Sequence, residues 1–454
     1  MGQHSAVAIN RNSHVGGRTS LEWRPGGRTS FTRHIGGHRA WPQHLCVGIK
    51  QTKAAQLTDC PGRYLSSLGP ELLTPKTVLA LAVAILASSI AGLEMRVAQV
   101  SPLYESCPPK LYGGTERVVS YLTEELVRQG HEVTLFASGD SQTEATLRAA
   151  CDRALRLDPR CKDPLPHHLV MLNRVARSAE AFDIIHFHAD FLHFPLFAPL
   201  WGKTLTTTHG RLDLPDLPPL FREFPMMPLV SISDAQRAPL PWASWHGTVH
   251  HGLPTDLYLP GRGDGGYLAF IGRISPEKGV EKAINIARLV GIPLKIAAKV
   301  DKADLDYYND KIKRLLKGPG VEFIGEIGDR DKGEFLGRAM ALLFPIDWPE
   351  PFGLVMIEAM ANGTPVIAFR RGSVPKIIDE GVTGFVADSI DEAVAAVPRA
   401  ATLDRIGIRH RFEERFSVER MARDYVELYN DVRCRSSIDA VVLSTRAASQ
   451  RDAA

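Results

Sequence analysis

From Met95 onward the sequence alternates short apolar segments with amphipathic ones, and this alternation limits the possible folds more than any other feature. Residues 96–100 read as an apolar strand, a Gly-Gly turn follows, and residues 115–128 carry apolar side chains at helical spacing. Gly130 would end that helix, and the strand-like segment HEVTLFA comes next. Such an alternation of strand, helix and strand predicts a parallel sheet covered by helices on both faces.

The alternation runs through the chain in two series. Residues 183–188 and 204–208 read as further buried strands of the first series, which a glycine-rich stretch at 260–266 interrupts. The second series begins with YLAFIGR and continues with LKIAAKV, VEFIGEI, ALLFPI, PVIAF and GFVA. Because 454 residues suffice for two cores, we predict an α/β protein with one Rossmann-like domain over 95–259 and a second over 260–434. Neither half has G-x-G-x-x-G after its first strand, so no dinucleotide cofactor is expected.

Residues 1–94 differ from the rest of the chain. The string GGRTS occurs twice amid Arg, His and Gly without apolar periodicity, and we do not expect this extension to fold. Its apolar run at 77–93 is at the lower limit for crossing a bilayer and is also compatible with a signal-peptide core. We favour a third interpretation, in which the start codon lies upstream of the native one and Met95 opens the first strand. Residues 435–454 are expected to be a flexible tail.

Composition excludes several classes of partner. A formal net charge of +3 is too small for a chain of this length to indicate a nucleic-acid partner. The six cysteines show neither C-x-x-C pairs nor metal-ligand spacing, so a disulfide framework and a zinc site are not expected. A reducing cytoplasm fits this pattern best, and membrane contact is suggested by nothing beyond 77–93.

The segment PEPFGLVMIEAMANGTPVIAF contains the two most informative carboxylates. Prolines on both sides hold Glu350 in a non-helical loop, and a short helix is expected to start after Gly353. Glu358 lies in this otherwise apolar helix, where an unpaired charge would be costly, so we expect it to have a partner. A carboxylate that accepts two hydrogen bonds suits a ribose cis-diol, and free amides at the helix start suit a phosphate or a sugar hydroxyl. The alternative is a surface glutamate in an ordinary salt bridge.

Glu350, seven intervening residues and Glu358 resemble the Glu-x7-Glu signature of family 4 retaining glycosyltransferases. GRISPEKG at 272–279 resembles the donor-phosphate motif of that family, and YGGTERVV at 112–119 resembles its N-terminal glycine loop. The similarity covers about residues 95–432. It implies the GT-B fold, in which two Rossmann-like domains face each other across a cleft, and a hexosyltransferase that retains configuration and needs no metal or other cofactor. The donor would be a UDP- or GDP-hexose, and the acceptor, whether saccharide, lipid or small molecule, stays open.

Carried over to this sequence, the resemblance assigns Arg273 and Lys278 to the donor diphosphate, and it assigns Glu358 to the ribose. The residues themselves agree, because Arg273 ends a predicted strand at the edge where α/β sheets bind ligands. Two cations there would stabilise the charge on the departing diphosphate, as a metal does in other transferases. His209 ends another strand, and the alternative for it is a histidine that merely caps that strand. The expected catalytic residues are His209 and Glu350, and the expected donor-binding residues are Gly113, Gly114, Arg273, Lys278, Phe352, Gly353, Leu354, Val355 and Glu358.

Other interpretations rest on weaker patterns. His186, His188 and His193 could bind a metal, since alternate residues of a strand share a face, although no carboxylate spacing completes the set. The DRD triplet at 329–331 could mark a metal-dependent transferase of another fold. A nucleotide-sugar epimerase and a non-catalytic sugar-nucleotide-binding protein are further alternatives. The segment RRGSVPKII departs from the family pattern and places Lys376 where an acid is frequent, which leaves the fine specificity for the donor open.

Overall fold

The computed structural model describes residues 94–110 and 113–451, with side chains up to residue 434. These residues all belong to one compact unit. The predictions for the N-terminal extension and its apolar run therefore lie outside the described residues. Among the helices that the structure does describe, none is long and apolar enough to cross a membrane.

The first series of strands forms a parallel sheet of seven strands in the order β3-β2-β1-β4-β5-β6-β7. The strands of this sheet that were predicted from the sequence are all present. Strands β3, β6 and β7, at the two sides of the sheet, were not predicted. The strand order reverses between β1 and β4, which is where open α/β sheets bind ligands. The strands are β1 (Arg96–Val100), β2 (Glu132–Ser138), β3 (Thr146–Cys151), β4 (Ile184–Phe187), β5 (Thr204–Thr207), β6 (Leu229–Ser231) and β7 (Trp245–Thr248).

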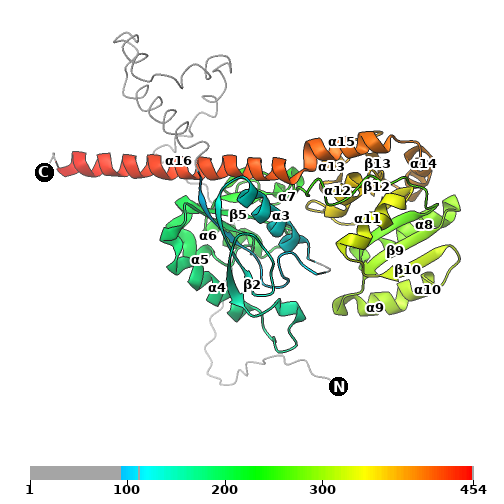
Figure 1. The fold of residues 1–454 in the computed structure, drawn as a ribbon, viewed down its shortest axis with the longest axis horizontal. Coiled ribbons are helices and arrows are strands. Elements are labelled where there is room, and N and C mark those ends of the chain that lie inside the picture. The colour runs from blue at the N-terminus through cyan, green and yellow to red at the C-terminus, as the bar shows by residue number, and fades with distance from the viewer. Residues whose placement is uncertain (1–93, 111–112, 452–454) are drawn as a thin grey trace, which may run out of the picture. The chain divides into compact units, whose positions relative to one another are not determined.

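Helices cover both faces of this sheet because alternate strand residues point to opposite sides. On one face, Val97 and Ile184 pack against Val118 and Leu122 of α3. On the other face, the strands pack against the helices between β3 and β6 (Figure 1). These helices are α3 (Gly114–Arg128), α4 (Leu165–Arg177), α5 (Phe194–Phe197) and α6 (Leu217–Glu223), and the short α7 (Asp234–Arg237) follows β6.

The second series forms a parallel sheet of six strands in the order β10-β9-β8-β11-β12-β13, so this order reverses between β8 and β11. Helices α8 and α14 pack on one face, and α12 and α15 pack on the other. The strands are β8 (Leu268–Arg273), β9 (Leu294–Lys299), β10 (Val321–Gly325), β11 (Ala341–Phe344), β12 (Val366–Phe369) and β13 (Gly384–Ala387). The helices are α8 (Val280–Val290), α9 (Leu305–Tyr307), α10 (Lys313–Leu315), α11 (Asp329–Arg338), α12 (Leu354–Ala361), α13 (Val374–Ile377), α14 (Ile390–Ala400) and α15 (Arg405–Phe416).

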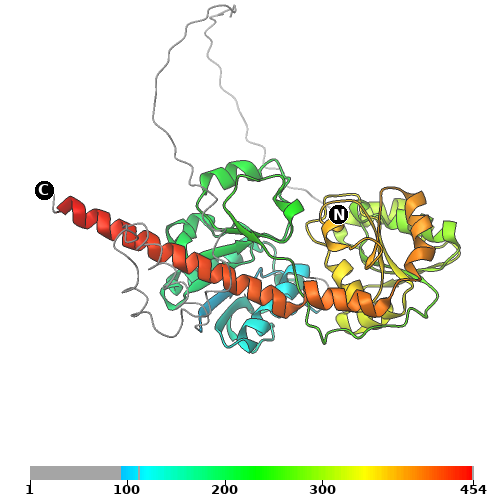
Figure 2. The same ribbon diagram turned by 90° about the horizontal axis from the view of Figure 1, so that it is seen from above.

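The last helix, α16 (Val418–Arg451), follows the second sheet in sequence but packs on the first. Figures 1 and 2 both show it running alongside the N-terminal sheet. Met421, Tyr425 and Tyr429 are fully buried there, in the same core as Val97 and α3. The N-terminal core is therefore completed by residues from the far end of the chain. The domain limits proposed from sequence stay predictions.

Candidate active site

One pocket collects most of the residues singled out from the sequence. It lies at the carboxyl ends of β8, β9, β10 and β11 and at the amino ends of α3 and α12. The first amides of a helix have no partner within it, so both helix ends offer N–H groups and a partial positive charge to an anion. His209 and Phe352 do not line the pocket. The predicted residues that do are Gly113, Gly114, Arg273, Lys278, Glu350, Gly353, Leu354, Val355 and Glu358.

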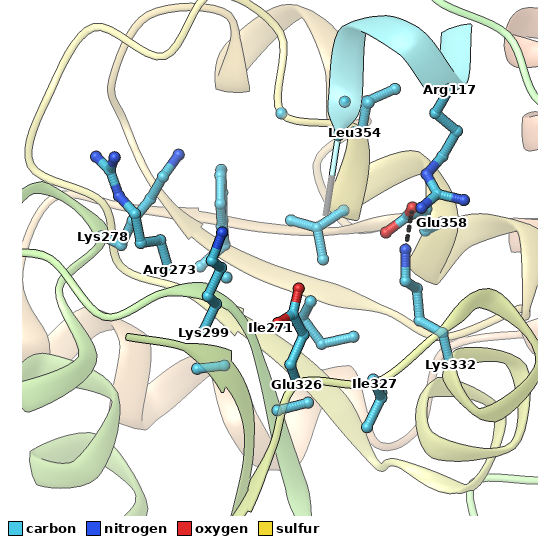
Figure 3. Close-up of a pocket in the computed structure, with 18 of the residues that line it drawn as sticks. Arg117, Ile271, Arg273, Lys278, Lys299, Glu326, Ile327, Lys332, Leu354 and Glu358 are labelled. Atoms are coloured by element: carbon cyan, nitrogen blue, oxygen red, sulfur yellow. Dashed lines mark hydrogen bonds and ion pairs between the residues drawn. The ribbon is translucent and has the colours of Figure 1, made fainter. Parts of the chain in front are cut away.

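Cations gather at one end of the pocket, where Figure 3 shows Arg273, Lys278 and Lys299 together. Lys278 Nζ lies 2.6 Å from Glu350 Oε2, and Arg273 is paired with Glu277 and with Asp304 at 3.4 Å. The two cations assigned to the diphosphate are thus held by carboxylates on loops that follow the strands.

A tight turn holds Lys278 in place. Gly279 has φ of 68°, and a Cβ built on it would lie 2.2 Å from the carbonyl oxygen of Pro345. A side chain at this position would therefore force apart the loops after β8 and β11. Because the backbone can approach so closely, Lys278 reaches the loop that carries Glu350.

The segment that departs from the family pattern, RRGSVPKII, contacts the Glu350 loop through hydrogen bonds and close backbone packing. Trp348 Nε1 donates to Glu350 Oε2 at 3.0 Å, and the Ser373 amide donates to the Glu350 carbonyl at 2.9 Å. Gly372, with φ of 52°, would place a Cβ 2.3 Å from that same carbonyl oxygen. Ser373 Oγ also donates to the carbonyl of Phe352 at 2.8 Å. The RRGSVP segment therefore holds the backbone of the loop that carries this carboxylate, a role that its sequence did not indicate.

Glu358 has the partner that its burial requires, and that partner is Lys332 of α11. Lys332 Nζ lies 2.7 Å from Glu358 Oε1 and 3.3 Å from Asp329 Oδ1. Asp329 also pairs with Arg117 of α3, so the cluster joins elements of both sheets. Figure 3 shows Arg117, Lys332 and Glu358 at the pocket end opposite Arg273.

Sequence reasoning missed Lys332 and Arg117, because each lies among other charged residues on a helix and their burial follows from packing alone. Both side chains are almost fully buried. The DRD triplet is part of the same cluster, with Asp329 bound to cations. In residues 94–110 and 113–451, no group of three or more His, Cys, Asp or Glu residues is arranged to hold a metal ion.

The N-terminal sheet contributes histidines beside this pocket. His209 Nε2 lies 2.9 Å from His188 Nδ1, and the His209 ring stacks on His251 at 5.3 Å. His251 in turn contacts the ring of Phe352 at 4.8 Å, which links His209 to the Glu350 loop. Burial lowers the pKa of His209 to about 3, so its imidazole is neutral at pH 7.

The proposed histidine metal site is not supported by the hydrogen bonds in this region. His186 bonds through Nδ1 to Tyr429 at 2.7 Å and through Nε2 to Thr207 at 2.7 Å. Both ring nitrogens of His188 are likewise bonded within the protein. Burial also holds the pKa of each of these imidazoles well below its usual range. They are neutral members of a polar network and have no ring nitrogen left for a metal.

Together, the fold and the pocket define a class of protein. Two parallel α/β sheets contribute to one pocket, which has Arg273 and Lys278 at one end, Glu358 with its cationic partner at the other, and two helix amino ends in its lining. This arrangement suits a ligand with an anionic centre and a polyhydroxyl group, such as a sugar nucleotide.

Comparison with known proteins identifies the family. Residues 260–415 match the family Glycosyl transferases group 1, and residues 112–243 match Glycosyltransferase Family 4. The chain belongs to the glycosyltransferases of GT-B fold. The predicted α/β fold and the resemblance to family 4 are thus confirmed.

The individual relatives match only part of this chain or share a modest sequence identity with it. The D-inositol 3-phosphate glycosyltransferase of Mycolicibacterium smegmatis is 28% identical over 249 residues, which are 49% of this chain and 55% of that protein. The match thus spans about half the length of this curated relative. The structure of AviGT4, a glycosyltransferase involved in avilamycin A biosynthesis, is 26% identical with a TM-score of 0.57 and covers 75% of this chain and 98% of its own. Anabaena HepE in complex with UDP and glucose shares the fold at 17% identity and a TM-score of 0.58, over 74% of this chain and 99% of its own.

Proposed function

We propose that this chain transfers a hexose from a UDP- or GDP-hexose to an acceptor hydroxyl, with retention of configuration and without a metal. The observation that carries the proposal is the placement, at opposite ends of one pocket, of groups suited to two different parts of the donor. Arg273 and Lys278 lie at one end and Glu358 at the other (Figure 3). A nucleoside diphosphate has the same order of groups, since its diphosphate and its ribose hydroxyls lie at different points along an elongated molecule.

Each end of the pocket has chemistry for one part of this donor. Arg273 and Lys278 would neutralise the charge that grows on the departing diphosphate. Glu358 would accept hydrogen bonds from the ribose hydroxyls, and these would compete with its bond to Lys332. Glu350 and the first amides of α12, from Gly353 on, would contact the transferred sugar, where positive charge develops at the anomeric carbon.

The proposed route needs no general base from the protein. The acceptor hydroxyl attacks the anomeric carbon on the face from which the diphosphate leaves, and a phosphate oxygen takes the proton of that hydroxyl. The role of the side chains is to bind, to orient and to stabilise charge. His209, neutral and fixed by His188, would contact the sugar from the N-terminal side.

The relatives support the nucleotide-sugar donor and leave the acceptor open. The HepE structure contains UDP and glucose, and the mycobacterial relatives are named for a phosphorylated inositol acceptor. For this chain the acceptor is proposed only as a hydroxyl of a saccharide, lipid or small molecule. A cytoplasmic location is part of the proposal, and it is supported by the four described cysteines, which are all free thiols.

The test is a panel of UDP- and GDP-hexoses measured for protection against thermal unfolding, for hydrolysis and for transfer to a mixed set of acceptors. One donor should stabilise the protein, and NMR of the product should show the anomeric configuration of the donor. Consumption of the donor with an epimerised sugar and no transfer would instead indicate an epimerase, and binding without turnover would indicate a non-catalytic protein.

A matched pair of lysine variants ties this result to the pocket. Lys278→Met should abolish most of the protection, because it removes a cation from the pocket. Lys282→Met is the control, since Lys282 is paired with Asp347 at 2.8 Å and does not line the pocket. Equal effects of both changes would contradict the assignment of Lys278 to the diphosphate.

A further inference from the structure

A continuous chain of buried hydrogen bonds connects the C-terminal helix to His209. Gln99 Nε2 donates to Tyr429 Oη at 3.0 Å, and Gln99 Oε1 lies 2.8 Å from His188 Nε2. His188 Nδ1 lies 2.9 Å from His209 Nε2. Gln99, His188 and Tyr429 are each at most 1% exposed, so water does not compete for these bonds. We refer to Tyr429, Gln99 and His188 as the relay.

The order of donors and acceptors along the relay determines where the protons lie. An amide oxygen can only accept, so His188 must carry its proton on Nε2 to bond Gln99. His188 is neutral because burial keeps its pKa well below the usual range, and its Nδ1 therefore holds a lone pair. His209 must then donate from Nε2 to that lone pair. The remaining nitrogen of His209, Nδ1, is left without a proton.

That remaining nitrogen is itself unusual. His209 Nδ1 is buried and has no hydrogen-bond partner among the residues that the structure describes. A buried acceptor without a donor is unfavourable, so such an atom calls for a ligand that donates a hydrogen bond to it. A sugar hydroxyl is a donor of this kind, and the loop of His209 adjoins Phe352 through His251.

The members of the relay come from distant parts of the sequence. Gln99 lies on β1, and His188 directly follows β4. Their partner His209 is the second residue after β5, and all three lie at the switch point of the N-terminal sheet or next to it. Tyr429 lies on α16, 330 positions from Gln99 in the sequence. The docking of α16 is therefore what supplies the first acceptor of the relay.

We propose that the relay fixes the tautomer of His209, so that Nδ1 presents a lone pair to a hydroxyl of the bound sugar. Tyr429, Gln99 and His188 are then positioning residues, which act on the substrate only through His209. The inference rests on the proposed function in one respect, namely that the ligand of His209 is the sugar of the donor. It implies that the hydroxyl facing His209 is recognised as a donor of a hydrogen bond and not as an acceptor.

The tautomer can be read directly in the full chain labelled with ¹⁵N-histidine. Two-bond ¹H–¹⁵N correlation spectra at pH 7 distinguish protonated from unprotonated ring nitrogens, and His209→Asn identifies the signals of His209. We expect Nε2 protonated and Nδ1 unprotonated in the wild type. A proton on Nδ1 would overturn the proposal, because the relay would then run in the opposite direction. This spectrum needs no donor, so it tests the relay even if no nucleoside diphosphate hexose is a substrate.

Variants of the relay separate positioning from helix docking. Tyr429→Phe and Gln99→Met should give a mixture of both His209 tautomers and lower the donor kcat/KM roughly three- to tenfold, as expected for one neutral hydrogen bond. Tyr425→Phe is the matched control: it removes an equally buried hydroxyl of α16, which bonds Thr207 at 2.9 Å and has a hydrogen-bond path to Tyr429 through Thr207 and His186. It should leave the His209 signals in place.

Two results would contradict the relay. One is an equal change of the His209 spectrum in Tyr429→Phe and Tyr425→Phe, which would indicate that α16 acts only by packing. The other is an unchanged spectrum in Tyr429→Phe. If Gln99→Met does not fold, the wild-type spectrum and the two tyrosine variants still decide the question. In the wild type, a saturating bound donor should shift the Nδ1 signal, and an Nδ1 signal that does not respond would refute the contact with the sugar.

Discussion

The two sheets hold polar clusters of opposite kind. On the C-terminal sheet, full charges neutralise each other, with Lys278 bound to Glu350 and Lys332 bound to Glu358. On the N-terminal sheet, neutral imidazoles such as His188 form hydrogen bonds with both nitrogens. A cation that is paired with a carboxylate can exchange that partner for a charged ligand. His186 and His188, in contrast, are bonded at both ring nitrogens, and neutral groups bonded in this way have one arrangement and hold it. The difference suggests that the C-terminal half binds the charged donor and that the N-terminal half serves as a fixed template.

The largest effect is expected at Glu350. Glu350→Gln keeps the shape of the side chain and removes the charge that we propose to act on the anomeric carbon, so kcat should fall by about 10² or more with less change in donor affinity. The check is to measure the steady-state kinetics of Glu350→Gln and of a control variant, Glu322→Gln. Glu322 is an exposed carboxylate on β10 outside the pocket. An unaltered kcat would mean that the ion pairs of the C-terminal sheet are structural.

Glu358 should affect binding more than turnover. Glu358→Ala removes the hydrogen bonds that we propose this residue makes to the ribose, equally in the ground state and the transition state, so the donor KM should rise roughly ten- to hundredfold. Because this change also leaves the Lys332 ammonium without its 2.7 Å partner, melting temperatures must be compared. The double variant with Lys332→Met should regain stability without regaining affinity. Recovery of KM in the double variant would show that Glu358 serves only to pair Lys332.

The histidine cluster should make the N-terminal half sensitive to acid. Burial keeps the pKa of His186, His188, His193 and His251 well below the usual range and that of His209 at about 3. In the unfolded chain these groups take up protons near pH 6.5, so the unfolded state binds more protons as the pH falls from about 6.5 towards 3. Stability should then decrease by about 1.4 kcal/mol per pH unit for each histidine.

Urea unfolding between pH 7 and pH 5 measures this slope. His193→Asn should reduce it by the contribution of one proton, since Asn cannot be protonated. Stability that stays constant over this range would contradict the neutral histidine cluster and would weaken the contrast between the two halves.

The smallest effect is expected from removal of metal ions. Activity should be unchanged in EDTA, because in the proposed function Arg273 and Lys278 take the place of a metal at the diphosphate. An assay before and after chelation suffices as a measurement. Inactivation that Mn²⁺ reverses would instead favour a role for the DRD triplet and would require Asp329 to leave its partners Arg117 and Lys332.

Much of the fold could be predicted because its buried strands are continuous apolar runs. Strands such as β11 and β12 are buried at every position, which makes them readable from the sequence. The missed strand β3 is largely exposed at the edge of its sheet, so its side chains follow no buried pattern. The missed β6 is buried but only three residues long, too short for a periodic signal.

The candidate site was predictable where its residues are neighbours in the sequence. The spacing of Glu350 and Glu358 within one loop and helix could be read directly, as could the turn from Arg273 to Lys278. Burial of Glu358 in an apolar helix required a cationic partner, but nothing local pointed to Lys332. Charged residues are frequent on helices such as α11, and only packing determines which of them becomes buried.

The sequence by itself determined the alternation of strands and helices, the two series that form the sheets, and the carboxylates and cations of the donor motifs. These features follow from periodicity and from short-range backbone chemistry, which act between neighbours. Only the tertiary structure decided that α16 returns to the N-terminal sheet, that Lys332 pairs with Glu358, and that Tyr429 bonds Gln99 across 330 positions. A buried hydrogen bond depends on the distance and direction of two atoms in space, and residues far apart in the chain acquire that geometry only when the cores have packed.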